Sequence, residues 1–264
     1  MSAWLFYALL APLFFSVGNI LDKLLRSRHL GTFAFTIFVG LMSFWALALI
    51  PFVGFPASFT VIIACLLAGV LFFSSGFPYF KALSIEEASR VIPLWALEAP
   101  LTLAMAFFFL NERLMLTDYA GFVLVVAGAF LVSARSLEGL FKPSKPLLLM
   151  LLASSLTASS IVLSKWLYSQ LPFWQVQLLT NLGGGLVALL LLLVFSNQRK
   201  VFLKEMSVLD KAAVFQLGIR QLVFFSASLV FGLAIMTGSP SLSSALVKLA
   251  ALFVFIFAVL LSRF

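Results

Sequence analysis

Residues Phe33–Val53 read FAFTIFVGLMSFWALALIPFV, an uninterrupted run that contains no charged side chain. A helix that crosses the hydrocarbon core of a bilayer needs about 20 predominantly apolar residues. Inside the bilayer every backbone polar group must find its partner within the protein, and a helix supplies those partners within one segment. The sequence therefore predicts a transmembrane helix over Phe33–Val53.

Eight further stretches share this apolar character and are separated by turn residues. Their approximate bounds are Trp4–Leu24, Ser58–Phe80, Ala88–Leu110, Asp118–Ala134, Leu147–Leu167, Val176–Phe195, Ala212–Met236 and Ser241–Ser262. The chain of 264 residues is 63% hydrophobic and only 10% charged, whereas soluble domains carry about 25% charged residues. So little charge could not cover the surface of a soluble protein. We predict an all-α integral membrane protein with about nine transmembrane helices.

Lys and Arg are distributed unevenly between the two ends of the predicted helices. Thirteen of them fall on the side of the first loop, and only Arg113 and Lys165 fall on the opposite side. The thirteen are Lys23, Arg26, Arg28, Lys81, Arg90, Arg135, Lys142, Lys145, Arg199, Lys200, Lys204, Lys211 and Arg263. Because basic loops stay in the cytoplasm, we expect a multi-pass protein of the cell (inner) membrane with its N-terminus outside. The net charge of +8 is then a topology signal, and no nucleic acid partner is expected.

The two halves of the chain resemble each other. Ile20–Leu25 aligns with Val162–Leu167, and further along the chain Val70–Ser75 aligns with Leu222–Ala227. Self-similarity of this kind indicates an internal repeat. We predict one repeat over residues 1–135 and a second over residues 146–264. Since the first contains five spans, an odd number, the second must be inverted in the membrane, an arrangement that recurs in transporters.

Several motifs at the end of the first repeat resemble the EamA domain of the drug/metabolite transporter superfamily. They are Lys81–Ser84 at the entry to the fourth span, Glu98-Ala99-Pro100 near its middle, Leu110–Leu114 at its exit, and the spaced glycines Gly121 and Gly128 of the fifth span. Lys23 and Lys165 also match the Lys common at the end of the first helix of each copy. Two details depart from the family pattern: one residue separates Glu98 from Pro100, and Asn111 replaces the usual Gly.

This resemblance implies a transporter with ten helices, in two inverted repeats, and with both termini in the cytoplasm. The sequence departs from that expectation in two ways. The charge count places the N-terminus outside, and the second repeat ends before its fifth helix, because Glu112 aligns with Phe264, the last residue. We therefore expect the second repeat to be truncated to four helices.

Three ionisable residues lie near the middle of predicted spans: Glu98, Arg220 and Lys248. Each such residue costs about 2.5–3.5 kcal/mol on insertion scales, so it usually marks a functional site. Glu98 and Lys248 lie on spans that correspond in the two repeats. We predict that Glu98 faces Lys248 or Arg220 across a central cavity, either as a substrate-binding or coupling group or as a static ion pair.

Polar and aromatic side chains near these charges complete the predicted site. Trp95 and Thr102 share the helix face of Glu98, and Ser244 shares that of Lys248, by their i, i+3, i+7 spacing. Tyr79 is expected to stack on or cap a substrate, or else to pack. The remaining candidates are two amides expected to be buried, Asn19 and Asn181, which would bind a substrate or form interhelical hydrogen bonds.

No catalytic pattern accompanies this site. The chain has a single His, His29, and a single Cys, Cys65, and it contains no HExxH, GxSxG or Walker motif. We therefore expect no metal site, no cofactor and no enzymatic activity. Without a nucleotide-binding loop, transport would have to be driven by a gradient, by exchange or by downhill flow.

These observations favour a secondary transporter that moves a small polar metabolite by alternating access. Two cations and one carboxylate at the predicted site suggest an anionic or zwitterionic solute. The alternative is a truncated, non-transporting or partner-dependent membrane protein, and a membrane enzyme is disfavoured by the missing motifs. Membrane lipid is an expected partner, and the sequence leaves a homo-oligomer open.

Overall fold

The computed structural model describes residues 3–26, 31–56, 58–133 and 144–261. Throughout these ranges the regular secondary structure is helical. The first part of the chain forms α1 (Ala3–Arg26), α2 (Thr32–Met42), η1 (Ser43–Leu49), α3 (Ile50–Val53), α4 (Phe59–Ser74), α5 (Gly76–Leu83), α6 (Ala88–Val91), η2 (Ile92–Leu97), α7 (Glu98–Leu110) and α8 (Leu116–Ser133). The second part forms α9 (Lys145–Gln170), α10 (Phe173–Val194), α11 (Ser196–Ser207), α12 (Lys211–Thr237), α13 (Pro240–Val247) and α14 (Ala250–Leu261).

Eight helical stretches of the described chain are long and apolar enough to cross a membrane. They correspond to eight of the nine predicted spans. The other one, Asp118–Ala134, lies on α8, of which Leu116–Gly128 forms a shorter apolar stretch among the described residues. Large apolar side chains stand on the outside of the bundle, among them Phe52 and Leu116, which are 85% and 86% exposed. Since such a surface is unfavourable in water, the protein is a multi-pass membrane protein.

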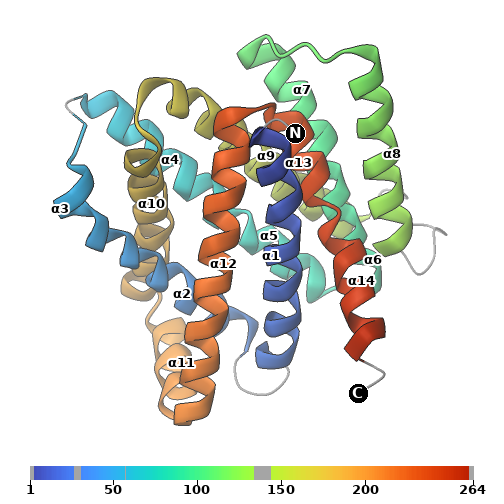
Figure 1. The fold of residues 1–264 in the computed structure, drawn as a ribbon. Coiled ribbons are helices and arrows are strands. Elements are labelled where there is room, and N and C mark those ends of the chain that lie inside the picture. Colours follow the sequence, from blue (N-terminus) through green and yellow to red (C-terminus); the bar gives the residue numbers. More distant parts are fainter. Residues whose placement is uncertain (1–2, 27–30, 57, 134–143, 262–264) are drawn as a thin grey trace.

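The helices form a bundle around α9, half of which is buried. Figure 1 shows α1 and α12 side by side at the front, α10 packed beside α4 and α2, and α7 with α8 on the opposite flank. The N-terminus lies at one end of the bundle and α11 at the other. We refer to the end where α12 joins α13 as the upper end, as in Figure 1.

Several spans are interrupted rather than continuous, and proline explains two of the breaks. Pro78 has no N–H and would clash with the carbonyl of residue 74, and α4 ends at Ser74. In the fourth span Pro93 lies in the 3-10 segment η2, and Pro100 occupies the first turn of α7, where a missing N–H costs nothing. The sequence predicted one unbroken helix in each of these places.

The connection between α10 and α12 is also helical. The polar residues that separate the seventh and eighth predicted spans form α11. The buried Phe202 anchors α11 in a core cluster with Phe35 and Leu217. The Glu205 carboxylate accepts a hydrogen bond from the backbone N–H of Gly31, at 2.7 Å. This helix therefore closes the lower end of the bundle against the start of α2.

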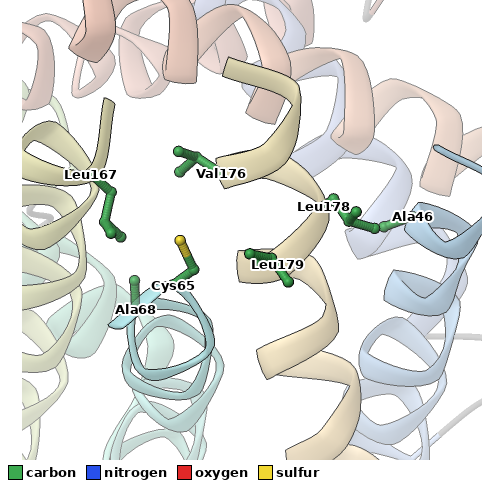
Figure 2. Packing of buried hydrophobic residues seen from close by; sticks show 7 residues of the cluster. All are labelled: Ala46, Cys65, Ala68, Leu167, Val176, Leu178 and Leu179. Carbon is green, nitrogen blue, oxygen red and sulfur yellow. The ribbon is translucent and has the colours of Figure 1, made fainter. Parts of the chain in front are cut away.

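The backbones of α4 and α10 touch at two glycines. A Cβ added to Gly69 would lie 1.8 Å from the carbonyl oxygen of Thr180, and one added to Gly183 would lie 2.2 Å from that of Leu66. Only glycine allows two backbones to approach this closely. Beside it, an apolar cluster packs α4 and α10 against α9 and η1, as Figure 2 shows; its members are Ala46, Cys65, Ala68, Leu167, Val176, Leu178 and Leu179.

Element boundaries in the two halves follow the register in which Val70–Ser75 aligns with Leu222–Ala227. In that register Pro240, which begins α13, corresponds to Ala88, which begins α6. Likewise Ala250, which begins α14, corresponds to Glu98, which begins α7. The fourth and ninth spans are thus interrupted at matching positions. The division into two repeats, over residues 1–135 and 146–264, stays a prediction.

Candidate functional site: a polar seam between α7 and α13

The position of Glu98 follows from the interruption of the fourth span. Because Pro100 is tolerated only in the first turn of a helix, α7 begins at Glu98, directly after η2. The backbone N–H of Glu98 is itself bonded to the carbonyls of Trp95 and Ala96 in η2. Glu98 is 5% exposed, so its carboxylate is buried at the junction of two helical segments and needs a charged partner there.

Lys248 occupies the complementary position on the ninth span. It follows Val247, the last residue of α13, in a short turn before α14. The end of a helix carries a partial negative charge and favours a cation. Lys248 and Glu98 form an ion pair in which the ammonium donates to Glu98 Oε2, and their side chains are 11% and 7% exposed. The pair therefore joins the start of one half-helix to the end of another.

The pair leaves hydrogen-bonding capacity unused. Glu98 Oε1 is buried and has no hydrogen-bond partner among the described residues. Thr102, which is fully buried, donates its hydroxyl to the Glu98 carbonyl at 2.9 Å and not to the carboxylate. A buried carboxylate oxygen without a donor is costly. The site thus presents an acceptor that a bound solute or water would satisfy.

The other predicted neighbours lie around this pair in different ways. Trp95 in η2 and Tyr79 in α5 are half-buried, with ring centroids 5.2 Å apart and an interplanar angle of 50°. Both pack against a cluster that includes Met150 of α9. Ser244 is fully buried on α13, and its hydroxyl donates to the carbonyl of Ser241 at 3.1 Å. Trp95 and Thr102 flank Glu98 on the fourth span, and Ser244 lies one turn from Lys248.

Arg220 is buried on α12, and it lies against aromatic rings. Its guanidinium carbon lies 4.4 Å from the ring centroid of Phe224 and 5.1 Å from that of Phe35. Nη1 also donates to Gln221 Oε1 at 3.2 Å. Of the two cations proposed as partners of Glu98, the structure therefore pairs it with Lys248. Phe35 belongs to the lower cluster with α11, so Arg220 sits towards that end of the bundle.

The two candidate amides do not meet at the ion pair. Asn19 is exposed on α1, so the expectation of a buried amide is wrong there. Its position on the helix faces outward, and the mean hydropathy of an apolar segment does not show which way a single position faces. Asn181 is half-buried, and its Nδ2 donates to the Gln177 carbonyl at 2.8 Å, within α10. That bond replaces the interhelical one expected. A role for either amide in substrate binding stays a prediction.

A second polar cluster, which sequence reasoning missed, lies at the upper end of the same seam. The Ser241 hydroxyl on α13 donates to Glu112 Oε2 in the turn after α7. Glu112 Oε1 is buried and has no partner among the described residues. Asn111, which precedes it, ends α7 in the left-handed conformation with φ 52°. Since Asn tolerates this conformation nearly as Gly does, the replacement of the family's Gly leaves the turn intact.

Lys165 of α9 completes this upper cluster. Its ammonium donates to the carbonyls of Ile235 at 2.9 Å, Met236 at 3.0 Å and Gly238 at 2.7 Å. The last carbonyls of a helix lack partners within it and favour a nearby cation, and an ammonium has three donors. All three N–H donors of Lys165 therefore bond to the end of α12. The side chain of Lys23, its counterpart in the first repeat, lies outside the described residues.

An open pocket of about 360 Å³ lies over this cluster at the upper end. Glu112, Lys165 and Gly238 form part of its wall, together with Trp166 and Ser169 of α9. The signals that could have found it are the Leu110–Leu114 motif and the Gly238-Ser239-Pro240 turn, which the sequence places in separate repeats. Only the packed fold brings these two segments together. No group of three His, Cys, Asp or Glu that could hold a metal occurs in the described ranges.

Comparisons with known proteins agree with this architecture. The family described as the EamA-like transporter family matches residues 2–134. No curated protein matches the sequence. One solved structure, described only as a crystal structure of a protein, is similar to this chain, with a TM-score of 0.69 and 18% sequence identity. The match covers 99% of this chain and 89% of the solved chain. At that identity the likeness shows the fold alone.

Proposed function

The chain belongs to the EamA-like transporter family, and on that premise we propose that it is a secondary transporter that moves a small polar solute by alternating access. The observation that carries this proposal is the Glu98–Lys248 ion pair. It lies inside the membrane, at the ends of two interrupted helices from different halves of the chain. Discontinuous helices at the interface between repeats hold the substrate and ion sites of many secondary transporters.

The solute class follows from what the pair can offer. Glu98 Oε1 is an acceptor without a donor, and the Lys248 ammonium has three N–H groups, one of which the carboxylate occupies. A solute that carries both a cation and an anion would satisfy both groups, and an anionic solute would bind Lys248 alone. We propose a zwitterionic or anionic metabolite on this ground, carried across the cell membrane.

Alternating access would exchange the partners of this pair. When the seam between α7 and α13 opens, the two charges separate and each needs a new partner, because an unpaired buried charge costs several kcal/mol. A bound zwitterion supplies both partners at once, so its binding would favour the open form. Energy would come from a solute or ion gradient. On this proposal the protein performs transport and not catalysis.

Uptake by reconstituted vesicles tests the proposal. Purified protein is first screened for thermal stabilisation by amino acids, nucleosides, sugars and phosphorylated metabolites, because a ligand of the folded form raises its melting temperature. Uptake of the radiolabelled hit is then compared between wild type and Glu98→Gln. We expect Glu98→Gln to reduce uptake at least about tenfold, the factor that corresponds to about 1.4 kcal/mol. Its matched control is Glu86→Gln, which removes a surface carboxylate paired with Arg90 at 3.8 Å.

Two results would count against this function. Wild-type uptake by folded Glu98→Gln protein would remove Glu98 from the mechanism. Wild-type vesicles that take up none of the four solute classes above the level of empty vesicles would reject a transporter of small polar metabolites.

A further inference from the structure

We propose that Glu112 and Ser241 form a latch that closes the upper end of the polar seam, and that Lys165 positions the turn that carries Ser241. This inference rests on the proposed function, because a latch matters only if the seam opens. It concerns residues other than the predicted binding site. It also assigns a role to a motif residue, Glu112, that the site at Glu98 does not use.

The latch lies between the ion pair and the upper pocket. On α13 Ser241, Ser244 and Lys248 follow each other at i, i+3 and i+7, so they share one helix face. At a rise of about 1.5 Å for each position along a helix, Ser241 lies about 10 Å above Lys248. The row of polar side chains from Ser241 to Lys248 is closed to solvent, since Ser241 and Ser244 are both fully buried. A solute entering from the upper pocket would therefore have to separate Ser241 from Glu112 first.

The latch consists of one hydrogen bond between the two halves of the chain. Glu112 lies in the turn between α7 and α8, and Ser241 lies in the first turn of α13. A hydrogen bond to a charged group contributes about 1.5–3 kcal/mol, enough to hold a contact shut and small enough to break during a cycle. The unpartnered Glu112 Oε1 keeps the bound carboxylate incompletely satisfied, which favours release.

Lys165 acts through the backbone of the turn and does not touch the latch bond. Its three hydrogen bonds hold the end of α12, at Ile235, Met236 and Gly238. The next residue, Ser239, accepts a hydrogen bond from Leu242 N at 3.0 Å and so fixes the start of α13. Lys165 therefore fixes the position from which Ser241 reaches Glu112. With all three donors engaged, it does not serve as a binding site for an anion in this closed form.

Side-chain accessibility tests the latch without any substrate. A Ser244→Cys reporter is placed in a Cys65→Ala chain, which otherwise has no cysteine. The protein is held in lipid nanodiscs and treated with a membrane-impermeant maleimide, and the labelling rate is followed by mass spectrometry. We expect Ser241→Ala to raise that rate at least about tenfold, the factor expected for loss of a hydrogen bond to a charged group. Glu112→Gln, which keeps a neutral acceptor for the Ser241 hydroxyl, should raise it by a smaller factor, and Glu86→Gln should leave it unchanged.

A second reporter separates opening of the seam from general loosening. Cys65 in the otherwise wild-type chain is fully buried beside the α4–α10 contact, so its labelling rate should not change with Glu112→Gln. Equal acceleration at Cys65 and Ser244→Cys would overturn the latch, as would an unchanged rate at Ser244→Cys in folded protein. Because labelling needs no transported solute, the latch can stand where the uptake experiment fails, and it can fail where uptake succeeds.

Discussion

Two seams of this bundle are built in opposite ways. At the α4–α10 seam the backbones touch through Gly69 and Gly183, and the neighbouring side chains form an apolar cluster. At the α7–α13 seam an ion pair, Glu98–Lys248, and a hydrogen bond from Ser241 join the helices beside a small apolar cluster that includes Ala99 and Ala245. The first seam has no room for water or solute, whereas the polar bonds of the second can be exchanged for bonds to water or a ligand.

This difference indicates which seam moves. Separating α4 from α10 would open a void between two backbones, and lost packing has no substitute. Separating α7 from α13 exchanges polar contacts for others to water or to a bound solute. We therefore expect the α4–α10 seam to stay closed while the α7–α13 seam opens. The first two variants below break one seam or the other, and the last two test contacts at the upper end of the bundle.

The largest effect is expected at the ion pair. Lys248→Met leaves Glu98 buried and unpaired, which should lower the free energy of unfolding by about 3–5 kcal/mol. The measurement is unfolding by SDS in mixed micelles. The double variant Glu98→Leu with Lys248→Met should recover most of the loss, because it removes both buried charges. A loss below about 1 kcal/mol in the single variant, the range of exposed ion pairs, would show that the pair is not buried as described.

The next effect is expected at the glycine seam. Gly69→Ala forces a methyl group into the Thr180 carbonyl, and overpacking of this kind costs about 1–3 kcal/mol. Gly121→Ala on α8 is the matched control, since nothing lies within 4 Å of the added Cβ and Ala favours a helix by about 1 kcal/mol. The same SDS titration compares them, and equal stability of the two variants would contradict a closed α4–α10 seam.

Sequence reasoning found the ion pair because mid-membrane charges are rare and conspicuous. It placed Glu98 and Lys248 on corresponding spans, but it left Arg220 open as a partner, because the depth of a residue says nothing about the direction in which it points. The prediction that Asn19 is buried was wrong for the same reason, because the sequence does not show whether one position on an apolar helix faces lipid or protein. The breaks before Glu98 and after Val247 were not predicted, although Pro93 and Pro100 carry the signal for the first.

The upper cluster was missed for a different physical reason. Glu112 and Ser241 are 129 positions apart and fall in different predicted repeats, so only the packed fold brings them together. Lys165, which the sequence shows only as a match to a family position, lies in the wall of the upper pocket, and its ammonium bonds to the end of α12. Sequence patterns describe single elements well, whereas contacts between repeats require the three-dimensional arrangement.

A smaller effect is expected at Lys165. Lys165→Met removes the three hydrogen bonds to the last carbonyls of α12, which should lower stability by about 1–2 kcal/mol and let that helix end fray. Hydrogen exchange at the Gly238 amide, which donates to Ala234 at 3.0 Å, should accelerate. Lys165→Arg keeps the cation and its donors and should restore slow exchange. Unchanged exchange in Lys165→Met would mean that the turn holds without its cap.

The smallest effect is expected where α1 meets the upper end of α13. Trp4 Nε1 donates to the hydroxyl of the fully buried Ser243 at 2.9 Å, so Trp4→Phe should cost about 0.5–1.5 kcal/mol. Ser243→Ala should cost a similar amount. Because one hydrogen bond is lost in both cases, the double variant should be less destabilised than the sum of the two, which unfolding titrations of all four proteins would measure. Strict additivity would show that α1 holds this end through packing of Trp4 over Gly238, and not through the polar contact.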